Sequence, residues 1–116
     1  MNTYERDGII KDLTEEKRII VCAPSTYALH IFTTILENLD DTGITPTKVS
    51  RVNGQETIQI GQGKLSFARS YNALRGREAD KALIAISVRE SPSFREQWFP
   101  NAQLATRNGT IEQISG

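Results

Sequence analysis

The sequence contains only one cysteine, Cys22, and one histidine, His30. A lone cysteine cannot form a disulfide within the chain, and one Cys with one His cannot supply the ligands of a zinc site. No apolar run approaches the roughly 20 residues that span a membrane, and the N-terminus has no basic start followed by an apolar stretch. We therefore expect no metal site, no membrane association and a reducing, cytoplasmic location, with Cys22 buried in a strand.

Nucleotide-binding glycine motifs are also missing. A Walker A loop reads GxxxxGK[ST] and lies between a strand and a helix. Around Gly63-Lys64, Ile58 stands where the first glycine belongs, and Leu65 follows the lysine in place of a hydroxyl. The segment Gly61-Gln62-Gly63 is better interpreted as a turn between two strands, and we predict no cofactor and no complete catalytic motif.

An excess of charge of one sign is absent as well, since 14 basic residues balance 14 acidic ones. The charges are nevertheless segregated: residues 1–41 hold four basic and eight acidic side chains, whereas residues 48–81 hold seven basic and three acidic ones. Such asymmetry indicates either a surface for an anionic ligand or two complementary faces that pair within the fold or between subunits.

The 116 residues, with 38% apolar and 24% charged, have the size and composition of one globular domain with one core. Residues 18–23 are continuously apolar and β-branched, which predicts a strand covered on both faces. Ser25 or Thr26 is expected to cap a helix that runs to about Leu39 and carries a wide apolar stripe. An earlier helix is predicted over residues 3–16, capped by Thr3.

The middle of the chain has the pattern of a β-meander, with short strands predicted over residues 48–52, 56–60 and 64–68 and a hairpin signal at Asn53-Gly54. A polar loop or short helix follows over residues 69–79, and then a second buried strand over residues 81–88. A short helix is predicted from Ser91 through Trp98, and two weak strands flank Asn108-Gly109. This order predicts an α/β fold: a small, three-layer, mostly parallel sheet with a meander in the middle, forming a single domain over residues 1–116.

Two groups of side chains are candidates for binding. The basic segment around Arg75-Gly76-Arg77 favours phosphate contact, because arginine forks onto phosphates and glycine permits close backbone approach. Its candidate nucleic-acid-binding residues are Lys64, Arg69, Arg75 and Arg77, although a solvated connector has the same composition. An apolar cluster of Phe94, Trp98 and Phe99 is the candidate partner-binding surface, or else a lid on the core.

A strand ending in VCAPS, followed by a helix with ALHIFTTIL, resembles the ATPase core of viral terminase large subunits and helicase-like ATPases. The segment GKLSFARSYNALRGREADKALIAIS is similar to their Arg-Gly, acid and apolar-strand region, so that Arg75, Gly76 and Asp80 match that pattern. The resemblance spans about residues 8–88 and implies a parallel α/β sheet. The Walker A loop is absent, and no Asp-Glu follows Ile86, so the ATPase activity of that family is not carried over.

Two functions of different classes follow. The first is a non-catalytic, terminase- or helicase-like accessory domain, of phage origin by resemblance, which binds nucleic acid or a nucleic-acid machine. The second is a protein-interaction module that self-associates or inhibits a partner enzyme. A third, an enzyme whose site is assembled between subunits, has no specific support in the sequence.

Overall fold

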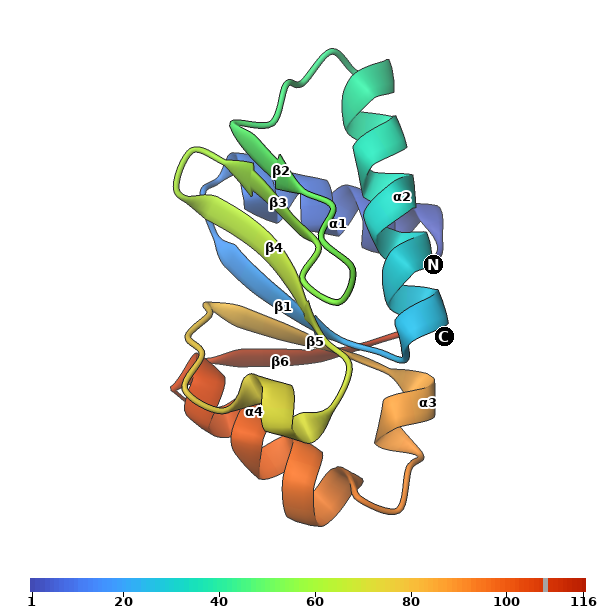
Figure 1. The fold of residues 1–116 in the computed structure, drawn as a ribbon, viewed down its shortest axis with the longest axis vertical. Helices are drawn as coiled ribbons and strands as arrows, with labels where there is room; N and C mark the ends of the chain where they lie inside the picture. Colours follow the sequence, from blue (N-terminus) through green and yellow to red (C-terminus); the bar gives the residue numbers. More distant parts are fainter. Residues whose placement is uncertain (108) are drawn as a thin grey trace.

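The computed structural model describes residues 1–107 and 109–116, which form a six-stranded sheet with the order β2-β3-β4-β1-β5-β6 (Figure 1). Strand β1 pairs in parallel with β4 and β5, and β5 pairs in parallel with β6, whereas β2, β3 and β4 form an antiparallel meander. The strands are β1 (Arg18–Cys22), β2 (Lys48–Ser50), β3 (Thr57–Ile60), β4 (Gly63–Ala68), β5 (Lys81–Ala85) and β6 (Thr110–Ile114). The predicted fold class is confirmed.

Helices cover both faces of the sheet. Helices α1 (Thr3–Thr14) and α2 (Ser25–Asp41) lie on one face, where Lys81 of β5 reaches Asp12 of α1 and Phe67 of β4 meets Phe32 of α2 edge to face. The other face carries η1 (Tyr71–Leu74), η2 (Phe94–Trp98) and α4 (Phe99–Thr106), and the short α3 (Ile86–Arg89) follows β5. The molecule therefore has the predicted three layers.

Strand β1 lies at the centre of the core. Ile19 and Val21 point toward the α1–α2 layer and Ile20 and Cys22 point toward the other, and each side chain is at most 2% exposed. Both faces of β1 are covered, which explains why its sequence is continuously apolar and does not alternate.

The turn between β3 and β4 confirms the interpretation of the glycine-rich segment. Gly61 adopts a left-handed φ of +58°, which glycine tolerates without steric cost. A Cβ on Gly63 would lie 2.6 Å from the carbonyl oxygen of Leu13, so only glycine lets the turn approach the end of α1 this closely. These glycines serve backbone packing.

The loop between β2 and β3 is longer than the predicted two-residue hairpin, because β2 ends at Ser50 and β3 begins at Thr57. Gly54 still has a positive φ of +84°, and the turn is closed by a 2.8 Å hydrogen bond from Gln55 N–H to the Val52 carbonyl. The turn signal is confirmed, but the loop length is not.

Both predicted helix caps are wrong. Asn2, and not Thr3, caps α1, and it forms a reciprocal capping box with Glu5. Pro24 occupies the cap position of α2, and no side chain there accepts a backbone hydrogen bond. Helix α1 begins at Thr3 and α2 begins at Ser25, so the expected capping residues Thr3 and Ser25 are the first helical residues and the cap positions lie one residue earlier.

The C-terminal third differs most from expectation. Strand β5 ends at Ala85, and residues 86–89 turn into α3, which buries Val88 against the core. The short helix continues through Pro100 as α4 to Thr106, where the first of the two weak strands was predicted. The second weak strand is present as β6, and Asn108 lies outside the described residues.

Candidate nucleic-acid interface

The basic segment after β4 folds back onto the sheet. Ser70 caps η1, and the chain then returns along the face opposite α1 and α2 toward β5. The Arg77 guanidinium reaches Ser66 in the middle of β4, so this segment is not a simple solvated connector. The fold thereby places a cation on the sheet surface itself.

Arg77 is held by neutral acceptors. Its guanidinium donates to the carbonyls of Phe67, at 2.9 Å, and Ala73, at 3.3 Å, and to the Oγ of Ser66 at 2.6 Å. Partial burial lowers the pKa of Arg77, yet an arginine remains charged at physiological pH. Within the part of the chain that the structure describes, no carboxylate forms an ion pair with Arg77, so its positive charge is oriented but not neutralised.

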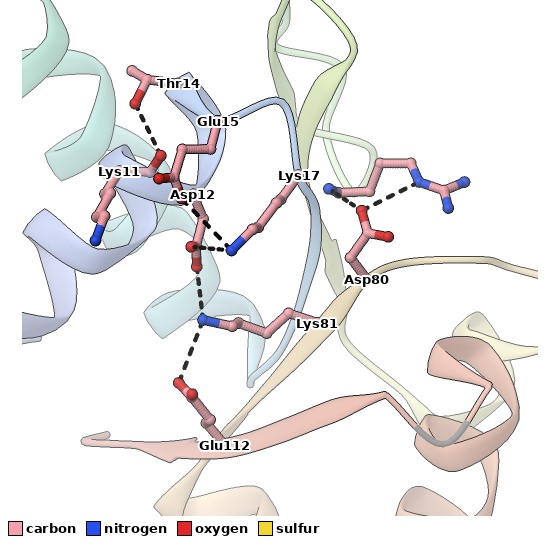
Figure 2. Close-up of polar contacts among 9 residues, drawn as sticks. Lys11, Asp12, Thr14, Glu15, Lys17, Asp80, Lys81 and Glu112 are labelled. Carbon is pink, nitrogen blue, oxygen red and sulfur yellow. Dashed lines mark hydrogen bonds and ion pairs between the residues drawn. The ribbon is translucent and has the colours of Figure 1, made fainter.

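Lys64 and Arg77 share one hollow. It has a volume of about 150 Å³ and is also lined by Arg18 and Ser66, with Glu78 on its rim. Arg18 already forms an ion pair, because its Nε lies 3.6 Å from a carboxylate oxygen of Asp80, which Figure 2 labels. Lys64 has no ion pair among the described residues, so Lys64 and Arg77 are the cations left for an anion in this hollow.

Arg75 and Arg77 line a second hollow, of about 480 Å³, which Glu78 also lines. Gly76, with a φ of +74°, turns the chain between the two arginines, and a Cβ there would meet nothing within 4 Å. The rim also includes Arg107, at the end of α4, which contacts Glu78. Sequence reasoning missed Arg107 because it lies 30 positions from Arg77 in a segment of balanced charge.

Arg69 lies apart from these residues. It follows the carboxyl end of β4, whereas Lys64 lies at the amino end. Its guanidinium is 2.6 Å from the carboxylate of Glu56, which is only 5% exposed. Lys64 and Arg75 therefore each share a hollow with Arg77, whereas the fourth predicted residue, Arg69, forms an internal ion pair.

The predicted charge pairing between the acidic N-terminal third and the basic middle occurs at few positions. Among the described residues, Lys81 is the one basic side chain of residues 48–81 that pairs with that acidic third, through Asp12 at 2.8 Å. Arg18, a basic residue of the acidic N-terminal third, forms ion pairs with Glu78 and Asp80 of the basic middle. Internal pairing therefore leaves Lys64, Arg75 and Arg77 without carboxylate partners in the described chain.

The apolar cluster is divided between core and surface. Trp98 is buried, and its ring packs edge-on against Tyr71 with centroids 6.2 Å apart. Phe94 and Phe99 are partly exposed, with ring centroids 5.7 Å apart, and both border a hollow beside β6.

No metal or nucleophile site emerges in residues 1–107 and 109–116, where no cluster of three metal-ligating side chains exists. His30 stacks on Tyr27 with ring centroids 6.0 Å apart. Burial raises the pKa of the Cys22 thiol to about 12, so this side chain stays protonated and unreactive. No helix in the described residues is long and apolar enough to cross a membrane.

Comparison with known proteins gives one informative result. No family model and no curated protein matches the chain. The solved structure of the large terminase from a thermophilic bacteriophage, in complex with ADP, superimposes with a TM-score of 0.64 and 13% sequence identity. The chain has a terminase-like fold. The match covers 95% of this chain but only 29% of the phage protein, and at this identity it shows the fold alone.

The terminase-like fold agrees with the resemblance noted in the sequence. The carboxyl end of β5 leads directly into α3, so that Ile86 and Ser87 follow the strand.

Proposed function

We propose that this chain is a non-catalytic, terminase-like accessory domain that contacts nucleic-acid phosphates through Lys64, Arg75 and Arg77. The observation that carries the proposal is Arg77, a cation fixed on the sheet by three neutral hydrogen-bond acceptors. A charge that the fold orients but does not neutralise is available to an external anion. Lys64 and Arg75 each line a hollow that Arg77 also lines. We call these three basic residues, Lys64, Arg75 and Arg77, the nucleic-acid track.

The test is salt-dependent binding of fluorescently labelled single- and double-stranded DNA and RNA. Phosphate contacts release condensed counterions, and each lost contact flattens the log–log salt slope by roughly 0.7 to 0.9. The double variant Lys64→Ala/Arg75→Ala is expected to weaken binding and to reduce the slope by about 1.5. Arg77 is left intact, because its internal hydrogen bonds would make its loss a change in stability too.

The matched control is Lys11→Ala/Arg95→Ala, which removes two exposed cations from α1 and η2 and is expected to leave the slope unchanged. Absence of binding to any of the nucleic acids at low salt contradicts the proposal. So does an equal loss of slope in the control, since binding would then follow net charge and not this track.

We also predict that the 116-residue chain alone does not hydrolyse ATP or GTP. The GxxxxGK[ST] loop that holds phosphates and magnesium is absent from its sequence, and Ile86 and Ser87 follow β5 where a metal-binding acid is required. Steady-state phosphate release is expected to equal that of a no-protein control, with and without DNA. Release that co-elutes with the pure chain would contradict this.

The alternative function is a protein-interaction module that self-associates or inhibits a partner enzyme. The partial exposure of Phe94 and Phe99 favours it. This surface lies beside β6, whereas Lys64 lies on β4, so the two functions can be tested separately.

A further inference from the structure

The two edges of the sheet differ in how they are protected. Edge strands expose backbone N–H and C=O groups, and proteins protect them with short strands, proline and lysine. Strand β2 has all three features, since it is three residues long, begins at Lys48 and follows Pro46. Strand β6 has five residues and neither proline nor lysine. Among the described residues it pairs with β5 alone, so its outer edge is open.

An apolar groove runs along β6 on the α4 side of the sheet. It has a volume of about 200 Å³, and its apolar lining residues are Ile84, Phe94, Phe99 and Ile111. Arg89 donates a hydrogen bond to Gln113 and lines the groove as well. A side chain that projects from a neighbouring strand toward this face would meet aromatic and aliphatic surface.

An acidic groove, of about 510 Å³, runs along the other face of β6. Its lining includes the apolar residues Ile9, Leu83 and Ile114. The charged lining residues are Glu5, Asp7, Asp12 and Glu112 against Lys11 and Lys81.

Part of the charge in this groove is already balanced. Lys81 lies between Asp12 and Glu112 (Figure 2), and its Nζ is 2.8 Å from the carboxylate of Asp12 and 3.7 Å from that of Glu112. Burial raises the pKa of Glu5, but the hydrogen bonds from Ser115 and Asn2, together with the charge of the N-terminus, leave this pKa below its ordinary value. Glu5 is therefore ionised, and the groove carries more negative than positive charge.

We propose that the open edge of β6 binds an extended segment of another polypeptide, which adds to the sheet as a further strand with alternating apolar and basic side chains. Successive residues of a strand point to opposite faces, so one set of side chains enters the Phe94–Phe99 groove and the other meets the acidic groove. Backbone hydrogen bonds give affinity, and the two grooves give specificity, as in other cases of strand addition. The inference deepens the protein-interaction alternative and does not depend on nucleic-acid binding.

A second copy of the chain fits this edge less well. Two-fold antiparallel pairing of two β6 strands centred on Glu112 would place two carboxylates directly opposite each other, which is destabilising. Pairing with the β2 edge of another copy would use a strand of only three residues. The partner is therefore expected to be a different polypeptide.

The probe is the fluorescent peptide Thr-Val-Lys-Val-Lys-Val-Thr. The comparison probe is the charge-reversed peptide Thr-Val-Glu-Val-Glu-Val-Thr. Fluorescence anisotropy is expected to show tighter binding of the lysine peptide to the wild-type chain, by about fivefold, the upper range for one exposed ion pair. Glu112→Lys is expected to abolish this preference, because it leaves three acidic and three basic side chains around the groove. Phe99→Ala is expected to weaken the binding of both peptides. Glu37→Lys, an exposed reversal on α2, leaves the preference unchanged.

Thermal unfolding of each variant separates loss of binding from loss of fold. Glu112→Lys removes the 3.7 Å ion pair with Lys81, which lies at an exposed position, so only a small loss of stability is expected. The proposal is overturned if neither peptide binds or if the preference survives Glu112→Lys. It is also overturned if light scattering shows a wild-type dimer that Glu112→Lys dissociates, because a second copy then occupies the edge. Lys64→Ala/Arg75→Ala must bind the peptide normally, which distinguishes this surface from the nucleic-acid track.

Discussion

Arg69→Ala is expected to destabilise the protein by about 3–5 kcal/mol, the cost typical of removing one partner from a buried ion pair. The guanidinium lies 2.6 Å from Glu56, whose side chain is 5% exposed, and Arg69 itself is 22% exposed. Truncation would leave the Glu56 carboxylate buried without its counter-charge. The Nε of Arg69 is buried without a hydrogen-bond partner among the described groups, so the ion pair with Glu56 is the main interaction of this side chain.

Urea denaturation of wild type and variant provides the measurement, with the midpoint shift converted through a shared slope. Arg75→Ala is the matched control, because Arg75 is an exposed arginine in the same segment and should change stability by no more than about 0.5 kcal/mol. In the double variant Arg69→Met/Glu56→Leu most of the loss should be recovered, since apolar replacement of a buried pair is often neutral. A loss below about 1 kcal/mol for Arg69→Ala would mean that water reaches and screens the pair.

This ion pair illustrates what sequence could not reveal about the basic segment. Arg69 and Glu56 are 13 positions apart, and they meet because β3 and β4 are antiparallel neighbours joined by a tight turn. The net charge of each segment located the basic region. It could not distinguish an arginine that pairs with a carboxylate from one that is free to bind an external anion. The hydrogen-bond acceptors of Arg77 are two backbone carbonyls and a hydroxyl, whereas that of Arg69 is a carboxylate.

The elements that sequence predicted well are those with strong local signals. The residues of β1 are almost all apolar, which is typical of a buried strand. The two closely spaced glycines Gly61 and Gly63 are typical of a tight turn. In contrast, the sequence signals for α4 and β6 are weak. Helix α4 has Pro100 in its first turn and no clear apolar face, and β6 is mostly exposed. The end of β5 was misplaced because Val88, in α3, is as buried as a strand residue, so the apolar run continues past the strand.

Helix α2 allows the sharpest test of the core. The apolar stripe predicted from the sequence consists of Ala28, Leu29, Ile31, Phe32, Ile35, Leu36 and Leu39. Five of these seven residues are buried, and Leu36 is partly buried. Leu29 was assigned to the same stripe but is 51% exposed, so the buried face is narrower than the sequence pattern suggested. Leu29 and Ile35 have the same size and lie on the same helix, but Leu29 is exposed to solvent and Ile35 is buried in the core.

Ile35→Ala is expected to cost about 2–5 kcal/mol, whereas Leu29→Ala should cost much less. Ile35 is 0% exposed in the core that includes Val21 of β1, so truncation removes buried methyl groups and leaves a cavity that surrounding side chains fill only in part. At position 29 the truncated volume opens to solvent. Ile35→Val, a smaller truncation at the same site, should cost about 0.5–1.5 kcal/mol. Urea midpoints for the three variants test this order. A loss below about 0.5 kcal/mol for Ile35→Ala, or one equal to that of Leu29→Ala, would mean that α2 packs on the sheet through a different face.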